Sequence, residues 1–162
     1  MEADLDFIDL RILEILQQDG RASHSAIAEA VGLSQPSVHE RVKKLEQRGV
    51  IKGYAAIVDA EALGLDVLAF ISVRVGDYTP DDIAAAVAQI PEVVETHHIA
   101  GDECFIVKVR CRTNKDLQDI LQRIWASGPV TGSKTTIAFA TFKETTALPL
   151  PEVEGPKERR SA

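Results

Sequence analysis

Residues 31–54 read VGLSQPSVHERVKKLEQRGVIKGY, and this stretch decides the fold of the N-terminal part of the chain. Ser34 is suited to cap a helix, and Gly49 is suited to end it. Between them, apolar residues recur at the i, i+4 and i+7 spacing of a helix that buries one face. These residues are Val38, Val42 and Leu45. The stretch therefore predicts a short amphipathic helix.

Two further helices are expected before this one. Asp6 can cap the first helix, which should end before Gly20, and Ser23 can cap the second, which Gly32 closes. The apolar positions on which they depend are Ile8, Ile12, Ile15 and Leu16 in the first and Ile27 and Val31 in the second. Three short helices with a glycine in the turn before the third predict a (winged) helix-turn-helix domain over residues 1–49.

The apolar period becomes mixed after Gly49, which predicts a second domain of the α+β class. The expected strands are 50–58, 68–75, 93–99, 104–112 and 134–143. The expected helices start after the caps Thr79 and Thr113. Residues 50–66 are interpreted as a linker strand and connection, and residues 67–147 as a ferredoxin-like βαββαβ domain. Residues 148–162 hold three of the seven prolines and many charges, so we expect a disordered tail.

One face of the expected sheet has no helix to cover it. Both helices of a βαββαβ domain lie on the same side of its sheet. The opposite face would carry Leu68, Phe70, Cys104, Ile106, Ala138 and Ala140. Because these residues are too apolar to remain in water, we expect another subunit to cover them.

The net charge of −7 argues against DNA binding if it is taken as a single number. Between Leu33 and Gly53, however, five basic residues outnumber two acidic ones, which gives this segment +3 and leaves −10 for the rest of the chain. The basic residues are Arg41, Lys43, Lys44, Arg48 and Lys52. A local basic stripe on an acidic protein can still bind phosphates.

The third helix carries the candidate DNA-binding residues. Its exposed stripe at the i, i+4, i+7 and i+11 positions consists of Ser37, Arg41, Lys44 and Arg48. A recognition helix places its N-terminal side chains at base edges and its cations near phosphates. Gln35, Ser37 and His39 suit the first role, together with the cap Ser34, and Arg41, Lys44 and Arg48 suit the second. The alternative interpretation is a solvated charged face.

Other features indicate a reduced, cytoplasmic protein without a cofactor. Cys104 and Cys111 should point to opposite faces of one strand, so a disulfide between them is not expected. His97 and His98 are neighbours whose rings would also face opposite ways, so no metal cluster is expected. The N-terminus is acidic rather than basic and apolar, and no apolar run approaches the length of a membrane span.

Several motifs, in this order and spacing, resemble the Lrp/AsnC family, the feast/famine transcription regulators. The N-terminal ones are LDFIDLRILEILQQDGR at residues 5–21 and the stretch at residues 31–54 quoted above. The C-terminal ones are IAGDECFIVKV at residues 99–109 and TTIAFATFKE at residues 135–144. The resemblance covers nearly the whole chain up to about Thr146.

The resemblance implies binding of double-stranded DNA by a homodimer in which residues 50–58 pair across subunits. It also implies assembly of dimers, often to octamers of four dimers, and an amino-acid effector bound between subunits near Gly101. The family often has an acidic residue where this chain has Cys104.

The residues of this loop support sensing by their own chemistry. Gly101 allows close backbone approach, and Asp102 and Glu103 can pair with an ammonium group. Thr135 and Thr136 could add hydroxyls. The alternative is a polar hairpin turn.

Two other functions remain open at this stage. Some relatives of this architecture act on tetrapyrroles as sirohaem decarboxylases, and here His97, His98, Lys108 and Arg110 would be the candidate groups. That interpretation leaves the basic stripe of the third helix without a purpose. The second alternative is an adaptor that oligomerises without sensing a ligand. The chain carries no nucleophile–base pair, P-loop or dinucleotide-binding fingerprint, so we expect no enzyme activity.

Overall fold

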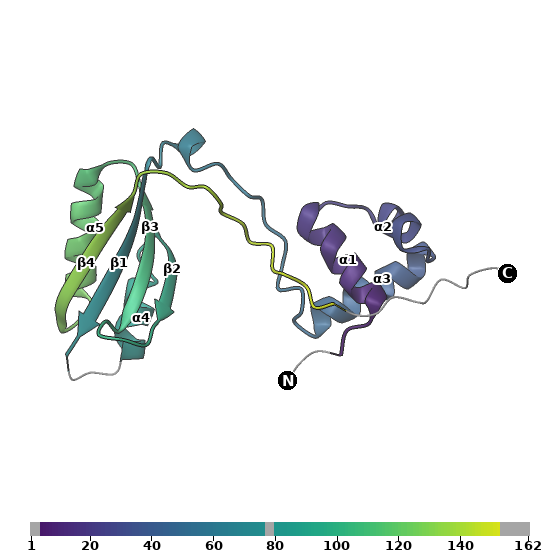
Figure 1. Cartoon of the computed structure of the whole chain (residues 1–162), viewed down its shortest axis with the longest axis horizontal. Coiled ribbons are helices and arrows are strands. Elements are labelled where there is room, and N and C mark those ends of the chain that lie inside the picture. The colour runs from purple at the N-terminus through teal and green to yellow at the C-terminus, as the bar shows by residue number, and fades with distance from the viewer. Residues whose placement is uncertain (1–3, 77–79, 153–162) are drawn as a thin grey trace. The chain divides into compact units, whose positions relative to one another are not determined.

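The computed structural model describes residues 4–76 and 80–152, which form two compact units. Among these residues, one unit combines 4–57 with 144–152, and the other comprises 58–143 (Figure 1). The chain therefore leaves the first unit, forms the second, and then returns to the first. The expected cap Thr79 and residues 153–162 of the expected tail lie outside the described residues.

The first unit contains the three expected helices, α1 (Phe7–Gln18), α2 (His24–Val31) and α3 (Gln35–Gln47). Each begins at the residue predicted from sequence, since the side chains of Asp6, Ser23 and Ser34 all accept a backbone N–H of the following turn. Gly32 ends α2 with a φ of 69°, in the left-handed region that favours glycine. These local signals are confirmed.

The core of the first unit consists of the predicted apolar faces. Ile12, Ile27 and Val38 have no exposed surface, and Leu45 is almost as deeply buried. Burial of each such side chain stabilises the fold by roughly 1.5–3 kcal/mol. Because all three helices contribute, this core fixes α3 with one face inward and the opposite face outward.

The second unit is a four-stranded antiparallel sheet with two helices. Its elements are β1 (Val67–Val75), α4 (Pro80–Val87), β2 (Val93–His98), β3 (Phe105–Cys111), α5 (Asn114–Ala126) and β4 (Val130–Ala138), with a short 3-10 helix, Glu61–Leu63, before β1. The strand order is β2-β3-β1-β4. The predicted ferredoxin-like βαββαβ arrangement is confirmed.

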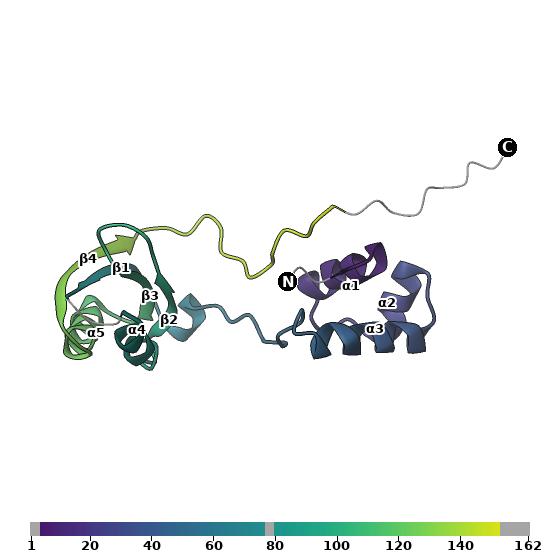
Figure 2. The same ribbon diagram turned by 90° about the horizontal axis from the view of Figure 1, so that it is seen from below.

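Both helices cover the same face of this sheet (Figure 2). On that face, Ile71, Val73, Phe105 and Val107 are fully buried. Helices α4 and α5 pack onto them with Ile83, Val87, Ile120 and Ile124. The alternation along β1 and β3 therefore separates a dry core from a second face.

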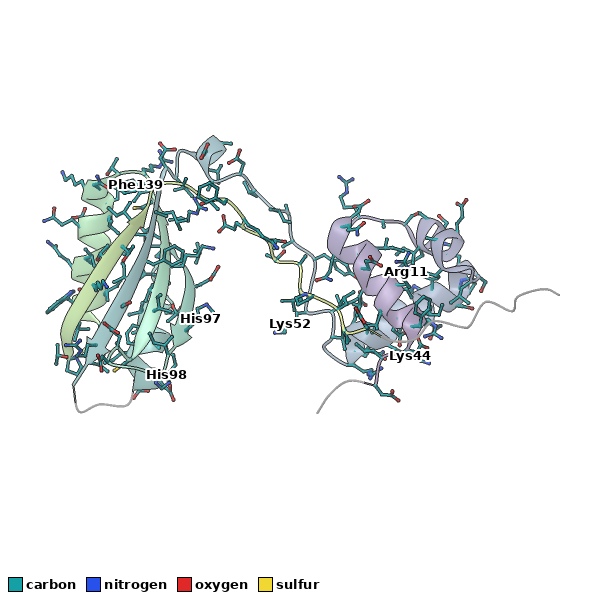
Figure 3. The ribbon with its side chains drawn as sticks, in the orientation of Figure 1. Arg11, Lys44, Lys52, His97, His98 and Phe139 are labelled. Carbon is teal, nitrogen blue, oxygen red and sulfur yellow. The ribbon has the colours of Figure 1, made fainter. Side chains whose placement is uncertain are left out.

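The second face is apolar along its centre and carries no helix. Leu68 is 6% exposed, whereas Phe70, Ile106 and Ala138 keep part of their surface in water. Beyond the end of β4, Phe139 and Phe142 are fully exposed, and Figure 3 labels Phe139. Within the second unit, the described residues leave this apolar surface uncovered.

Two expectations about the strands need correction. The last strand is Val130–Ala138 instead of 134–143, because β1 begins at Val67 and β4 has no partner strand beyond Ala138. Ala140 consequently lies outside the sheet. Residues 50–58 form no strand, since a strand needs a neighbour to complete its hydrogen bonds and this chain supplies none there. Residues 148–152, part of the expected tail, group with the first unit, where Leu148 binds Gln17.

We expect the protein to be at least a dimer at micromolar concentration, through the uncovered face of the sheet. Phe70→Glu places a charge at the centre of that face and should shift the mass towards the monomer. Gln122→Glu adds the same charge on exposed α5 and should leave the mass unchanged. Light scattering measures both, with circular dichroism to confirm folding. A monomeric wild-type protein would contradict this prediction.

Candidate DNA interface and effector loop

The outward face of α3 lies opposite its core stripe. At about 100° per residue, Pro36, Glu40, Lys43 and Gln47 project away from Val38 and Leu45. All four of these side chains are exposed. Within the described part of the chain, the side chains of Glu40, Lys43 and the adjacent Lys44 form no hydrogen bond or ion pair. This face is therefore free to meet a ligand.

Arg41, which we expected to contact phosphate, forms ion pairs with two aspartates of the first unit. Its Nη1 atom lies 2.7 Å from Asp6 Oδ2 and 2.7 Å from Asp9 Oδ1. Asp9 is 8% exposed, and Asp6 and Asp9 form a capping box at the start of α1. Arg41 therefore fastens α3 to the beginning of α1.

The electrostatics of this cluster agree with its geometry. Hydrogen bonds to Asp6 and Asp9 raise the pKa of Arg41 above its ordinary value. Burial acts to raise the pKa of Asp6, but the hydrogen bonds from the Asp9 backbone and Arg41 outweigh it, so this pKa falls below its ordinary 3.8. The charged forms of both partners are therefore favoured.

Arg48 is also occupied by an internal contact. Its Nη2 atom donates to the backbone carbonyl of Asp4 at 2.9 Å. Arg41 and Arg48 both make such contacts, whereas the side chain of the third cation of the stripe, Lys44, makes none among the described residues. Figure 3 labels Lys44. Two members of the stripe thus hold the N-terminal segment of the unit.

The polar residues at the start of α3 have mixed roles. Ser34 caps the helix by accepting the Ser37 amide at 3.3 Å, and the two hydroxyls lie 2.8 Å apart. Gln35 is exposed, and the ring of His39 lies 5.2 Å from that of His24 on α2. Gln35, Ser37 and His39 therefore gather at the N-terminal half of α3, as a recognition helix requires.

The sequence analysis did not name Lys43 and Glu40 as candidates for the DNA interface. Both were counted only as charges, although the helical projection already places them opposite Val38 and Val42. The stripe of Arg41, Lys44 and Arg48 has a regular helical spacing, which made it the more obvious candidate. Part of this stripe faces α1.

The effector loop joins β2 to β3. The Ile99 amide donates to the Cys104 carbonyl at 3.0 Å, and the Cys104 amide donates to Val73 on β1 at 2.8 Å. Gly101 has a φ of 137°, which L side chains rarely adopt, and open space surrounds its Cα. Gly101, Asp102 and Glu103 thus form one accessible loop at the end of the sheet.

Arg74 joins this loop and was not foreseen. Its Nε atom donates to the Asp102 carbonyl at 3.2 Å, and Thr131 on β4 donates its hydroxyl to the Arg74 carbonyl at 3.3 Å. Arg74 is exposed and lies on the same face of the sheet as Phe70. The loop therefore combines a guanidinium with two acidic side chains.

Thr135 and Thr136 are not brought to the loop within the chain. They pair with Ile71 and Phe70, whereas the loop meets the other end of β1, at Val73 and Arg74. Successive residues of a strand also face opposite sides of a sheet, so the two hydroxyls cannot act together. Within one chain they lie apart from Gly101, and their place in an effector site between subunits stays a prediction.

The histidines of β2 are engaged in surface contacts. His97 Nε2 lies 3.4 Å from a carboxylate oxygen of Glu95, whose other oxygen lies 2.8 Å from Lys108 Nζ. The hydrogen bond from Lys108 is the main cause that lowers the pKa of Glu95. His98 lies 3.9 Å from Asp81 (Figure 3).

Two groups of the tetrapyrrole alternative, His97 and Lys108, thus share the Glu95 carboxylate, and a third, His98, lies beside Asp81. Over residues 4–76 and 80–152, no group of three His, Cys, Asp or Glu residues could hold a metal ion. Cys104 and Cys111 are free thiols. Across the same residues, no helix is both long and apolar enough to cross a membrane.

The two units define a class of protein, a transcription regulator with a helix-turn-helix domain and a separate ligand-binding domain. Residues 5–46 match the AsnC-type helix-turn-helix domain, and residues 68–148 match the Lrp/AsnC ligand binding domain. The chain belongs to the Lrp/AsnC family, as its motifs indicated.

Individual relatives match almost from end to end. The HTH-type transcriptional regulator FL11 of Pyrococcus horikoshii is 41% identical over 150 residues, which cover 93% of this chain and 99% of that one. A feast or famine regulatory protein from Mycobacterium tuberculosis, solved with L-methionine, is 37% identical with a TM-score of 0.84 over 89% of this chain and 98% of that one. A regulator from Neisseria meningitidis, also solved with L-methionine, is 28% identical with a TM-score of 0.84 over 90% and 96%.

We expect Arg41→Ala to destabilise the first unit by about 1–3 kcal/mol, because it leaves the nearly buried Asp9 carboxylate without its partner. Lys44→Ala, on the same stripe, is the matched control and should stay within about 0.5 kcal/mol of wild type. Thermal and urea unfolding measure the difference. Equal stabilities would contradict the structural role of Arg41.

The stabilisation that Arg41 and Asp6 give to the first unit should depend on pH. Because the pKa of Asp6 is lowered on folding, its contribution is present above the ordinary value of 3.8 and is lost as pH falls through the lower value. The stability difference between wild type and Arg41→Ala should therefore shrink in acid below about pH 4.

Proposed function

We propose that this protein is a sequence-specific DNA-binding transcription regulator that works as a homo-oligomer and responds to an amino acid. Membership of the Lrp/AsnC family supports the general role. The observation that carries the specific proposal is the free outward face of α3, with Glu40, Lys43 and Lys44 exposed. The role is one of binding, not of catalysis, in the cytoplasm.

On DNA, Lys43 and Lys44 would contact phosphates, and Gln35, Ser37 and His39 would reach base edges. Glu40 is an acceptor without a partner among the described residues, which suits the exposed N4 amine of cytosine in the major groove. Arg41 and Arg48 position the helix instead of contacting DNA. The rest of the chain is negatively charged, so the electrostatic attraction to DNA would have to come from this face of α3.

The proposed oligomer forms through the uncovered face of the sheet. A two-fold dimer presents two recognition helices, so its DNA sites should be paired half-sites about 10 bp or a multiple of that apart. The family resemblance extends this to an octamer of four dimers. Residues 50–58, which lack a strand partner in the single chain, would find one in the other subunit.

The proposed effector site is the loop Gly101–Glu103 with Arg74. An amino acid carries a carboxylate and an ammonium group, and this loop offers a guanidinium for the first and two carboxylates for the second. L-methionine in two structurally similar regulators supports an amino acid as the ligand class. A ligand that contacts two subunits shifts their arrangement by its differential affinity, with couplings of about 1–3 kcal/mol.

We expect Lys43→Ala and Lys44→Ala each to weaken binding to all DNA sequences and to reduce the salt slope by about one unit per lost phosphate contact. Lys115→Ala removes an exposed cation from α5 and should leave binding unchanged. Glu40→Gln should instead relax the preference at one position of the site. Salt titrations and binding-site selection test these outcomes, and unchanged affinity in both lysine variants would overturn the proposed face.

We expect at least one of the twenty amino acids to raise the thermal stability of the protein and to change its DNA affinity. Arg74→Gln removes a charged hydrogen-bond donor and should weaken effector binding roughly 10-fold or more. Gly101→Val should abolish the response, because valine opposes the backbone conformation at this position. Calorimetry measures binding, with Lys115→Gln as control. Normal binding by both loop variants would show that the site lies elsewhere.

A further inference from the structure

The C-terminal segment returns to the DNA-binding unit and is held there by a side chain of α1. The carboxamide of Gln17 donates from Nε2 to the Leu148 carbonyl at 3.1 Å and accepts the Leu148 amide at 2.6 Å. One side chain thus satisfies both backbone polar groups of a residue 131 positions away in sequence. A pair of hydrogen bonds fixes the position and the direction of the segment.

The segment lies along α1 and closes one side of a groove there. One wall is a stripe at the i, i+3/i+4 spacing that runs along one side of the helix, and the other is the segment itself. The helix contributes Phe7, Leu10, Arg11, Glu14 and Gln17. From the tail, Leu150 is partly buried against the core of the unit, whereas Leu148 is 72% exposed and is held by its backbone. Figure 3 labels Arg11, which forms an ion pair with Glu14 in this wall.

The sequence of the segment suits an extended docked conformation. Pro149 and Pro151 each restrict the residue before them to extended backbone, so Leu148 and Leu150 are confined before docking. Restricting the free segment lowers the entropy that docking costs. The segment is therefore built to lie straight along α1.

This docking gives the second unit two chain connections to the first. One leaves after α3 and the other arrives on α1. Helix α1 in turn holds α3 through the Arg41 contacts with Asp6 and Asp9. Helix α1 therefore contacts both the tail and α3.

We propose that the α1 groove is the docking site of the chain's own residues 148–151, and that this docked tail holds the DNA-binding unit and couples it to the effector domain. The part of this proposal that concerns coupling rests on the proposed response to an amino acid. The part that concerns docking rests only on the contacts of Leu148 and Leu150.

Cross-linking tests which tail occupies the groove. Glu14→Cys combined with Glu152→Cys keeps Gln17, Leu148 and Leu150, and both positions line the hollow between α1 and the tail. A short bismaleimide should cross-link them within one chain, which mass spectrometry of the monomer band from a denaturing gel identifies. Each single variant is a control for reaction at Cys104 or Cys111. A dimer-sized product would show that the tail of a second copy docks there, and no product would mean that the groove is empty. Either result overturns the proposal.

DNA binding of the full chain tests the role of the docked tail. Gln17→Ala and Leu150→Asp should weaken DNA binding without any amino acid by roughly 2- to 10-fold, as expected for lost hydrogen bonds and packing. Gln18→Ala is the matched control, since Gln18 is exposed at the end of the same helix. Wild-type affinity in both docking variants would overturn the proposal.

The effector response separates coupling from the proposed function. If wild type shows a ratio of DNA dissociation constants with and without amino acid of about 5 to 150, that ratio should fall towards 1 in both docking variants. Calorimetry should still show amino-acid binding by these variants. An unchanged ratio overturns the coupling. If wild type binds no amino acid at all, the effector function and the coupling fail together, while cross-linking and basal DNA affinity still decide the docking.

Discussion

The contact of Arg41 with Asp6 and Asp9 is the constraint on which the DNA-binding unit depends. Asp9 is nearly buried, and a carboxylate removed from water is costly unless it is paired. Arg41 supplies that partner from α3, and the same two carboxylates cap the first turn of α1. The start of one helix and the orientation of another therefore depend on a single cluster of charges, which fixes the face that α3 can present.

This constraint changes which residues are available to DNA. A cation that neutralises a nearly buried carboxylate cannot also neutralise a phosphate without giving up its first partner. The DNA interface that we propose consequently lies on the outward side of α3, where Lys43 and Lys44 are exposed, and not on the side that faces α1. Because the rest of the chain is strongly acidic, an interface of this kind favours a well-fitting site over general attraction to nucleic acid.

The second unit has a sheet with two unlike faces. Helices α4 and α5 cover one face, and the described residues of the unit leave the other face uncovered. The loop at Gly101 and the guanidinium of Arg74 lie at the end of that sheet, so the proposed effector site adjoins the proposed subunit contact. After β4 the chain returns to the first unit, where Gln17 binds Leu148.

The sequence by itself determined the caps at Asp6, Ser23 and Ser34, the apolar stripes of the helices and the βαββαβ order, because these depend on spacing and on contacts within a few residues. Only the tertiary structure decided the partners of Arg41, the place of Arg74 beside Asp102, the end of β4 and the docking of Leu148. A periodic pattern shows which residues share a face, but it cannot show which distant segment meets that face.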